Sequence, residues 1–212
     1  KWKKLSNYRI KSPSTMVAEW DFEMSFNGQI EYAVFPGGVF DEQLYMHYEC
    51  VWGPDWDPVS GLTSGTSQMA CSGSDPERVV FNLPIEMGFN STNVFGWPQM
   101  IITVRAQNTI GGDSLRGYAL VLLPPTSGPR LVNAPLLRLR AATMLGEWLS
   151  WLTGRYPELA DPKMLANGKE NYCKYHASVM TSYGAVNLAL SMVSKDLRKL
   201  GYDNQPPMYR NM

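Results

Sequence analysis

Apolar and polar residues alternate along much of this chain with a period of two, and this period constrains the fold more than any other feature. In residues 18–26, Trp20, Phe22, Met24 and Phe26 alternate with acidic residues and a serine. Successive side chains of a strand point to opposite faces, so the pattern predicts a half-buried β-strand.

Seven further segments carry alternation, β-branched residues or short apolar runs bounded by turn residues. They are residues 29–35, 44–52, 79–89, 99–107, 117–124, 130–139 and 185–193. About eight short strands at this spacing are typical of an antiparallel β-sandwich. Residues 53–61 interrupt the pattern, and the polar residues 60–76 are expected to form a loop containing one short strand.

Three positions leave alternatives open. Asn27-Gly28 predicts a hairpin turn, but a continuous strand with a kink at the glycine fits as well. Pro84 indicates a sheet edge or a bulge, because proline cannot donate to a ladder. Residues 185–193 fit either a strand or a helix, and we favour a strand followed by a turn or short helix.

One segment changes period. Over residues 141–153, Leu145, Trp148, Leu149 and Leu152 fall on one stripe of a helix, which predicts a helical insertion near the C-terminal part. The fold class expected is therefore an all-β antiparallel sandwich with one helical insertion.

The length of 212 residues and a hydrophobic content of 44% suit one sizeable core. We expect a basic tail at residues 1–15, a single domain at 16–203 and a tail at 204–212. No apolar run approaches the roughly 20 residues that span a membrane, and no signal peptide is recognisable.

Charge is distributed unevenly although its formal sum is zero. Residues 1–11 hold five bases and no acid, residues 12–100 hold twelve acids and one base, and residues 101–212 hold thirteen bases and seven acids. Such asymmetry can create a dipolar surface that steers assembly. The alternative is that interleaved strands mix the segments in space.

Recognisable catalytic and ligand-binding motifs do not occur. His47 and His176 are the two candidate imidazole bases, and neither is near a nucleophile signature. Cys50, Cys71 and Cys173 form no metal-binding pair or disulfide framework, which favours a reducing, cytoplasmic compartment. We expect no enzyme activity, cofactor, metal or nucleic-acid ligand.

Several blocks in order resemble the B9 domain family. They are STNVFGWPQ (91–99), GDSLRGYA (112–119), NGQIE (27–31), GPDW (53–56), GR (154–155), DPK (161–163) and KDLRKLGYD (195–203). The similarity runs from about Phe26 to Asp203. Its structural signature residues are Gly28, Gly96, Trp97, Pro98, Gly117, Tyr118, Gly201 and Tyr202.

The resemblance implies a C2-like β-sandwich in a non-enzymatic scaffold of the ciliary transition zone, at the basal body and peripheral to the ciliary membrane. Its members support ciliogenesis and a membrane-diffusion barrier. The implied partners are other B9-domain proteins (of the Meckel syndrome protein 1 and B9 domain-containing protein 2 types) and tectonic-type and transmembrane components, with ciliary membrane lipid as a further possibility.

Calcium-dependent C2 domains gather several aspartates at one loop end, because calcium takes six to eight oxygen ligands. Here one candidate loop offers Asp113 alone and the other offers Asp41 and Glu42. We therefore expect calcium-independent binding. The alternative function is a peripheral lipid-binding module that uses the basic residues Lys1, Lys3, Lys4, Arg9 and Lys11.

Five residues are candidates for contact with a partner or membrane. Trp52 and Trp56 flank a turn, where they form either an exposed tip or part of the core. Trp148 and Trp151 lie on neighbouring faces of the expected helix, so one of them is a candidate interface anchor. Arg116 is expected to pair with Asp113 or with a partner carboxylate.

Overall fold

The structure, a computed structural model, describes residues 21–39, 43–108, 112–139, 143–146, 148, 156–166, 180–202 and 204. These residues form strands, a helical stretch at 144–146 and 148, and two short 3-10 helices, η1 (Pro162–Leu165) and η2 (Leu197–Leu200). The strands are β1 (Phe22–Val34), β2 (Gln43–Val51), β3 (Trp56–Gly61), β4 (Ser64–Thr66), β5 (Arg78–Ser91), β6 (Gln99–Asn108), β7 (Gly112–Leu122), β8 (Gly128–Leu139) and β9 (Met180–Lys195).

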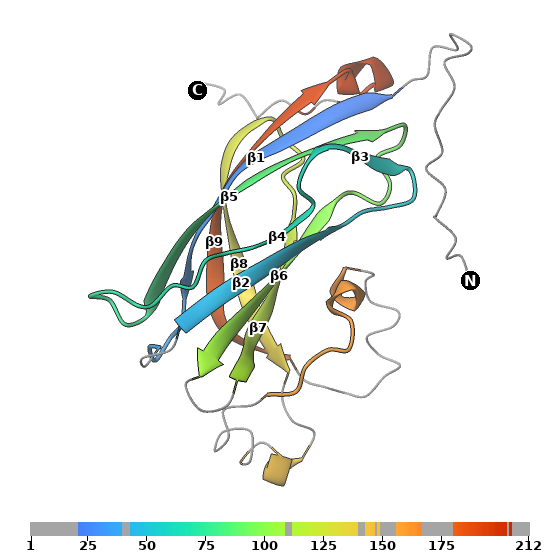
Figure 1. Ribbon diagram of the computed structural model, residues 1–212. Helices are drawn as coiled ribbons and strands as arrows, with labels where there is room; N and C mark the ends of the chain where they lie inside the picture. Colours follow the sequence, from blue (N-terminus) through green and yellow to red (C-terminus); the bar gives the residue numbers. More distant parts are fainter. Residues whose placement is uncertain are drawn as a thin grey trace, which may run out of the picture.

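The strands make one antiparallel sheet that curls into two layers. Their order is β3-β5-β1-β9-β8-β7-β6-β2-β4. Strands β7 and β8 share a single residue pair, Tyr118 with Leu137. The sheet bends there into a five-stranded layer (β3, β5, β1, β9, β8) and a four-stranded layer (β7, β6, β2, β4). Figure 1 shows β2 and β6 crossing in front of β8 and β9. The prediction of an all-β antiparallel sandwich is confirmed, with nine strands instead of about eight.

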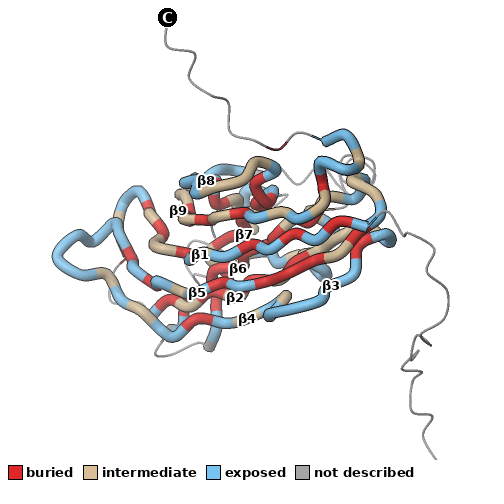
Figure 2. Tube along the Cα trace, turned by 90° about the horizontal axis from the view of Figure 1, so that it is seen from above, coloured by how far each residue is buried: buried red, intermediate tan, exposed pale blue. Residues whose placement is uncertain are grey.

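The core lies between the two layers and follows the period-two pattern. Along β1, Phe22, Met24 and Phe26 are buried while the residues between them are exposed, an alternation that Figure 2 shows along the strands. Cys50 of β2 and Met87 of β5 bring their sulfur atoms within 3.4 Å of each other across the layers. The apolar stripes of the sequence thus meet in one core.

Strand β1 continues through Asn27-Gly28, so the kinked-strand alternative is the one realised. The strand pairs with β5 on one side and β9 on the other along its length, with a bulge between Ile30 and Tyr32. A Cβ on Gly28 would collide with the carbonyl oxygen of Ala189 on β9. The glycine therefore permits a close approach of two central strands, not a chain reversal.

Strand β3 corrects the expectation that residues 53–61 break the pattern. It pairs with the C-terminal half of β5, from Trp56 opposite Ser91 to Gly61 opposite Met87. Pro84 of β5 lies beyond the end of β3, so that part of β5 is a local edge and tolerates a proline. Short polar strands such as β3 carry too little apolar pattern to be recognised from sequence.

Residues 185–193 lie within β9, as predicted, and η2 follows it. Of the helix expected over residues 141–153, the structure describes residues 143–146 and 148, of which 144–146 and 148 are helical. Two members of its stripe in the described part are exposed, Leu145 at 82% and Trp148 at 62%. The expected tails lie outside the described residues, apart from Asn204.

The uneven charges of the sequence are brought together by the fold. Lys195 of β9 lies 3.2 Å from Glu23 of β1, and Lys163 of η1 lies 2.7 Å from Glu49 of β2. Both pairs join a base from residues 101–212 to an acid from residues 12–100. Among the described residues, these pairs support the alternative in which interleaved strands mix the two segments.

Candidate partner-binding surfaces

Aromatic side chains close one end of the sandwich. Trp56, the first residue of β3, is 2% exposed, and its ring packs edge-on against Phe22 and Trp97 at centroid distances of 5.5 and 5.4 Å. Its Nε1 donates a 2.7 Å hydrogen bond to the carbonyl of Phe95. Trp56 therefore belongs to the core, and its ring has no exposed surface to offer a partner.

Trp52 and Trp97 flank the same cluster and are half-buried. Trp52 packs against Phe89 at a centroid distance of 5.3 Å. Trp97 Nε1 donates to the carbonyl of Leu123, 2.9 Å away, and thereby holds the loop after β7. Pro98 is buried beside it, immediately before β6. The G-W-P block thus joins two loops at one end of the molecule.

Two signature residues meet at the junction between the layers. A Cβ on Gly117 would lie 2.7 Å from Cγ of Leu136, so the glycine lets β8 approach β7 where the sheet bends. Its neighbour Tyr118 is 1% exposed and accepts a 3.1 Å hydrogen bond from the amide of Leu159. Burial raises the pKa of this phenol.

Residues 156–166, termed here the covering segment, cross the outer face of the four-stranded layer. Besides the bond to Tyr118, Glu158 pairs with Arg105 of β6 at 2.7 Å, and Lys163 pairs with Glu49 of β2. Figure 1 shows this orange segment beside β6 and β7. Within the covering segment, only the D-P-K block at residues 161–163, whose Asp161 caps η1, carries a signal recognisable from sequence.

The expected pair between Arg116 and Asp113 is wrong. Asp113 instead accepts a 2.6 Å hydrogen bond from the hydroxyl of Tyr45. Both residues lie in β7, not in a loop, and Arg116 is the extra residue of a bulge between the pairs Arg105–Leu115 and Val104–Gly117. Because Arg116 is the extra residue of a bulge, it lines a pocket instead of pairing with Asp113.

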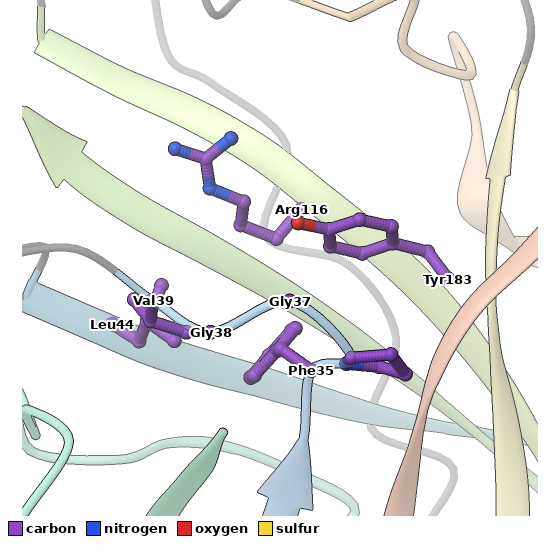
Figure 3. A pocket seen from close by; sticks show the side chains of 8 residues that line it. Phe35, Gly37, Gly38, Val39, Leu44, Arg116 and Tyr183 are labelled. Atoms are coloured by element: carbon purple, nitrogen blue, oxygen red, sulfur yellow. The ribbon is translucent and has the colours of Figure 1, made fainter. Parts of the chain in front are cut away.

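Arg116 lines a pocket of about 240 Å³ at the opposite end from the tryptophans. Figure 3 shows Arg116 and Tyr183 on one side of the pocket and the Gly37–Val39 turn on the other. The remaining described lining is apolar, from Phe35, Pro36 and Leu44. The lining is thus mainly apolar with one guanidinium and one phenol, and among the described residues that line it there is no carboxylate or imidazole.

The two most exposed large apolar side chains of the described residues lie within five residues of each other and of Trp148. Met144 is 89% exposed, Leu145 82% and Trp148 62%. Trp151, the other expected anchor, lies outside the described residues. Large exposed apolar groups at this density mark contact sites more often than solvated surface. Trp148 is therefore the strongest of the anchors considered from sequence.

The last two signature residues follow β9. Gly201 ends η2 with φ +82°, a left-handed conformation that favours glycine, and its amide donates to the carbonyl of Arg198. Tyr202 is 44% exposed beside it.

Reactive groups in the described part of the chain have structural surroundings. His47 Nδ1 lies 2.9 Å from the Thr66 hydroxyl across β2 and β4. Burial raises the pKa of the Cys50 thiol to about 12, whereas Cys71 is exposed.

Among the described residues, no three His, Cys, Asp or Glu side chains cluster as a metal site, and no helix is long and apolar enough to cross a membrane. His176 and Cys173, and the acidic residues Asp41 and Glu42, lie outside the described residues.

Comparison with known proteins gives matches that span most of the chain. A family model described as "B9-C2: Ciliary basal body-associated, B9 protein" matches residues 24–193. B9 domain-containing protein 1 of Xenopus laevis is 39% identical over 183 residues, which cover 86% of this chain and 89% of that protein. B9 domain-containing protein 2 of the same species is 25% identical over 86% of this chain and 98% of its own length.

Among solved structures, a C2 domain of plant Extended Synaptotagmin 1 aligns with 7% sequence identity and a TM-score of 0.38, over 80% of this chain and 92% of that domain.

Proposed function

The chain belongs to the family of ciliary basal body-associated B9 proteins, and from that premise we propose that it is a non-enzymatic scaffold subunit of the ciliary transition zone. In this role it binds other B9-domain proteins, of the Meckel syndrome protein 1 and B9 domain-containing protein 2 types. The assembly also takes up tectonic-type and transmembrane components, on the cytoplasmic side of the ciliary membrane, and supports ciliogenesis and the membrane-diffusion barrier.

The exposed apolar residues Met144, Leu145 and Trp148 are the structural observation that supports this proposal most directly. Large apolar side chains stabilise a protein when they are buried. Three such groups left in water therefore add nothing to the stability of the chain alone. Tryptophan is enriched among the residues that dominate binding energy at protein interfaces. A docking partner supplies the missing burial.

Two of the described pockets agree with a binding role. The pocket at Arg116 is lined by apolar residues, glycines, one arginine and one tyrosine. A groove on the outer sheet face is lined mainly by small or apolar side chains. Neither lining combines a nucleophile, a base and an orienting acid, which a hydrolytic triad requires.

Co-purification with the other two B9-type proteins tests the proposal. The chain is mixed with each of them and with both, and the products are sized by exclusion chromatography with light scattering. We expect a stable complex of defined stoichiometry. A chain that stays monomeric with both proteins, but floats with vesicles containing an anionic lipid, would replace the scaffold with the calcium-independent lipid-binding module.

A further inference from the structure

The outer face of the five-stranded layer carries almost no charge over its central strands. The residue pairs of β1, β9 and β8 align outward side chains in rows across the sheet. Two successive rows define what we call the uncharged face: Asn27, Ser191, Pro129, Gln29, Ala189 and Leu131. The rows on either side continue it, with Ser25 and Val193 at one end and Asn187 and Asn133 at the other.

This composition is unusual for a surface exposed to water. The chain holds 19 basic and 19 acidic residues, yet none of the residues in the two central rows is charged. Charge flanks these rows as Glu86 of β5 opposite Asn27, as the pair Glu23–Lys195, and as Arg78, which stacks on Tyr32 of β1. Arg130 of β8, between Pro129 and Leu131, is the one base that lines the groove between the central rows. Leu131 is 78% and Val193 59% exposed. Small uncharged side chains cost less to remove from water than charged ones, and the centres of protein interfaces are depleted of charge.

The opposite layer has no comparable free face. The covering segment crosses β2, β6 and β7, and Ile101 and Thr103, which lie on β6, are 2% and 7% exposed. Within the described part of the chain, the five-stranded layer is the one whose outer face is left open. The two faces of the sandwich are therefore not equivalent.

The strand edges are poorly suited to adding a strand from another chain. Edge strand β3 contains Pro58, and β4 has three residues. Strand β8, which meets β7 at one pair only, has Pro129 and Pro135 within it. Proline and short length are the usual devices that block pairing at an edge. A partner is therefore expected on a face and not on an edge.

The shape of the uncharged face favours a second sheet as its occupant. Three strands and four outward rows span about 14 Å by about 27 Å. The resulting area, about 400 Å², is roughly half of the surface area that one partner buries in an ordinary interface. The charged margin would supply a polar rim around this centre. The face has a shallow groove of about 260 Å³ between Asn27, Ala189 and Leu131, with Arg130 as the one charged residue in its lining. Two sheets pack face to face about 10 Å apart when small and medium side chains interdigitate.

We infer that the uncharged face is the docking surface for the outer sheet face of a second, related β-sandwich domain. The inference rests on the proposed function, because it names a second surface, besides Met144, Leu145 and Trp148, through which another B9-domain protein is bound. The bases beside the central rows, Arg130 and Lys195, are accompanied by the acids Glu86 and Glu23, so the face has no excess of basic side chains to attract an anionic membrane surface. Leu131 provides the largest apolar contact, beside the small Ala189.

The test places one charge at the centre of the face in the full-length chain. Leu131→Glu is compared with Leu62→Glu, a matched control whose leucine is 69% exposed in the connection between β3 and β4. Binding to the two other B9-type proteins is measured by calorimetry, and thermal melting verifies that both variants fold. We expect Leu131→Glu to weaken one of the two complexes at least tenfold and Leu62→Glu to change neither by more than twofold.

Photo-crosslinking gives a second readout that does not depend on a disruptive substitution. A benzophenone label on Asn187→Cys, in a chain that carries Cys71→Ser and Cys173→Ser, should capture the same partner, whereas a label on Leu62→Cys in the same chain should not. If the wild-type chain binds its partners but Leu131→Glu binds equally well, the docking surface is wrong and the scaffold function stands. If the wild-type chain binds neither protein, both fall. A homodimer lost on Leu131→Glu would overturn the inferred occupant in favour of a second copy.

Discussion

The amide of Gly53 donates a 2.8 Å hydrogen bond to the carbonyl of Gly96, and the two glycines pack backbone to backbone. A Cβ on Gly53 would lie 2.7 Å from the Cα of Gly96. This contact joins the turn before β3 to the loop before β6, and so links the two layers. Trp56 then reaches the carbonyl of Phe95, next to the same contact.

Replacing Gly96 with alanine should therefore destabilise the whole domain. Its φ of +70° is unfavourable for an L side chain by about 1–3 kcal/mol, and the new methyl group would press against Gly53. Gly73→Ala is the control, because a Cβ there meets nothing within 4 Å. Urea unfolding should show a clear loss for Gly96→Ala and a change within about 0.5 kcal/mol for Gly73→Ala. Equal stability of the two variants would contradict the close contact.

Two tryptophans should behave oppositely on truncation. Trp56→Ala removes a buried ring and its hydrogen bond, which should cost about 3–5 kcal/mol of unfolding free energy. Trp148→Ala removes an exposed ring and should change stability by about 0.5 kcal/mol or less while weakening partner binding. Chemical denaturation and binding assays on both variants separate the two roles. A stable Trp56→Ala protein would show that the aromatic cluster does not support the fold.

The covering segment should loosen when its bond to β7 is removed. Tyr118→Phe keeps the buried ring but deletes the hydroxyl that accepts the Leu159 amide, at a cost of about 1 kcal/mol. Hydrogen exchange at Leu159 should accelerate, while amides of β1 and β9 keep their protection. Val80→Ala, on an exposed position of β5, serves as the control. Uniform acceleration across the sheet would indicate global destabilisation instead.

Cysteine reactivity should follow burial. The thiolate is the reactive species, and burial raises the pKa of Cys50 to about 12. Iodoacetamide at pH 8 should therefore modify exposed Cys71 rapidly and Cys50 only after unfolding. Peptide mapping by mass spectrometry reports each cysteine separately. Rapid native-state labelling of Cys50 would mean that the layers open far more often than the packed core implies.

Stability should fall at alkaline pH through three phenols of the four-stranded layer. Burial raises the pKa of Tyr45, helped by its hydrogen bond to Asp113, and burial also raises the pKa of Tyr48 and of Tyr118. Since these folded-state pKa values lie above the unfolded value near 10, the folded state retains protons that the unfolded state releases. Their contribution is complete below about pH 10 and is lost above it. Urea midpoints from pH 8 to pH 11 should drop less in Tyr45→Phe than in the wild type.

The strands of the core could be predicted because apolar residues were confined to one face. In β2, Leu44, Met46, Tyr48 and Cys50 are all buried, as their spacing indicates. The same reasoning failed for β3, whose Trp56 is its only buried residue. Residues 56–61 form a strand because they pair with β5, and the local sequence of β3 has no apolar pattern that predicts this pairing.

Side-chain partners were less predictable than strands. Asp113 and Arg116 are three residues apart in sequence, which suggested an ion pair. In the structure a bulge places Arg116 toward the pocket, and Asp113 accepts a hydrogen bond from Tyr45 instead. The uncharged face was visible in the sequence as serine, asparagine and glutamine at the polar positions of β1. Its significance depends on β8 and β9 lying beside β1, an arrangement set by tertiary structure.

In the described part of the chain, the last strand, β9, lies between the first strand, β1, and β8. Glu23 and Lys195, which pair across β1 and β9, are 172 residues apart in sequence. During translation, β1 therefore leaves the ribosome long before its neighbour exists, and β5 is its only available partner until Met180–Lys195 is made. A chain cut short before residue 180 would expose the inner edges of β1 and β8 together. Such a fragment is a substrate for chaperones and proteases rather than a smaller version of the domain.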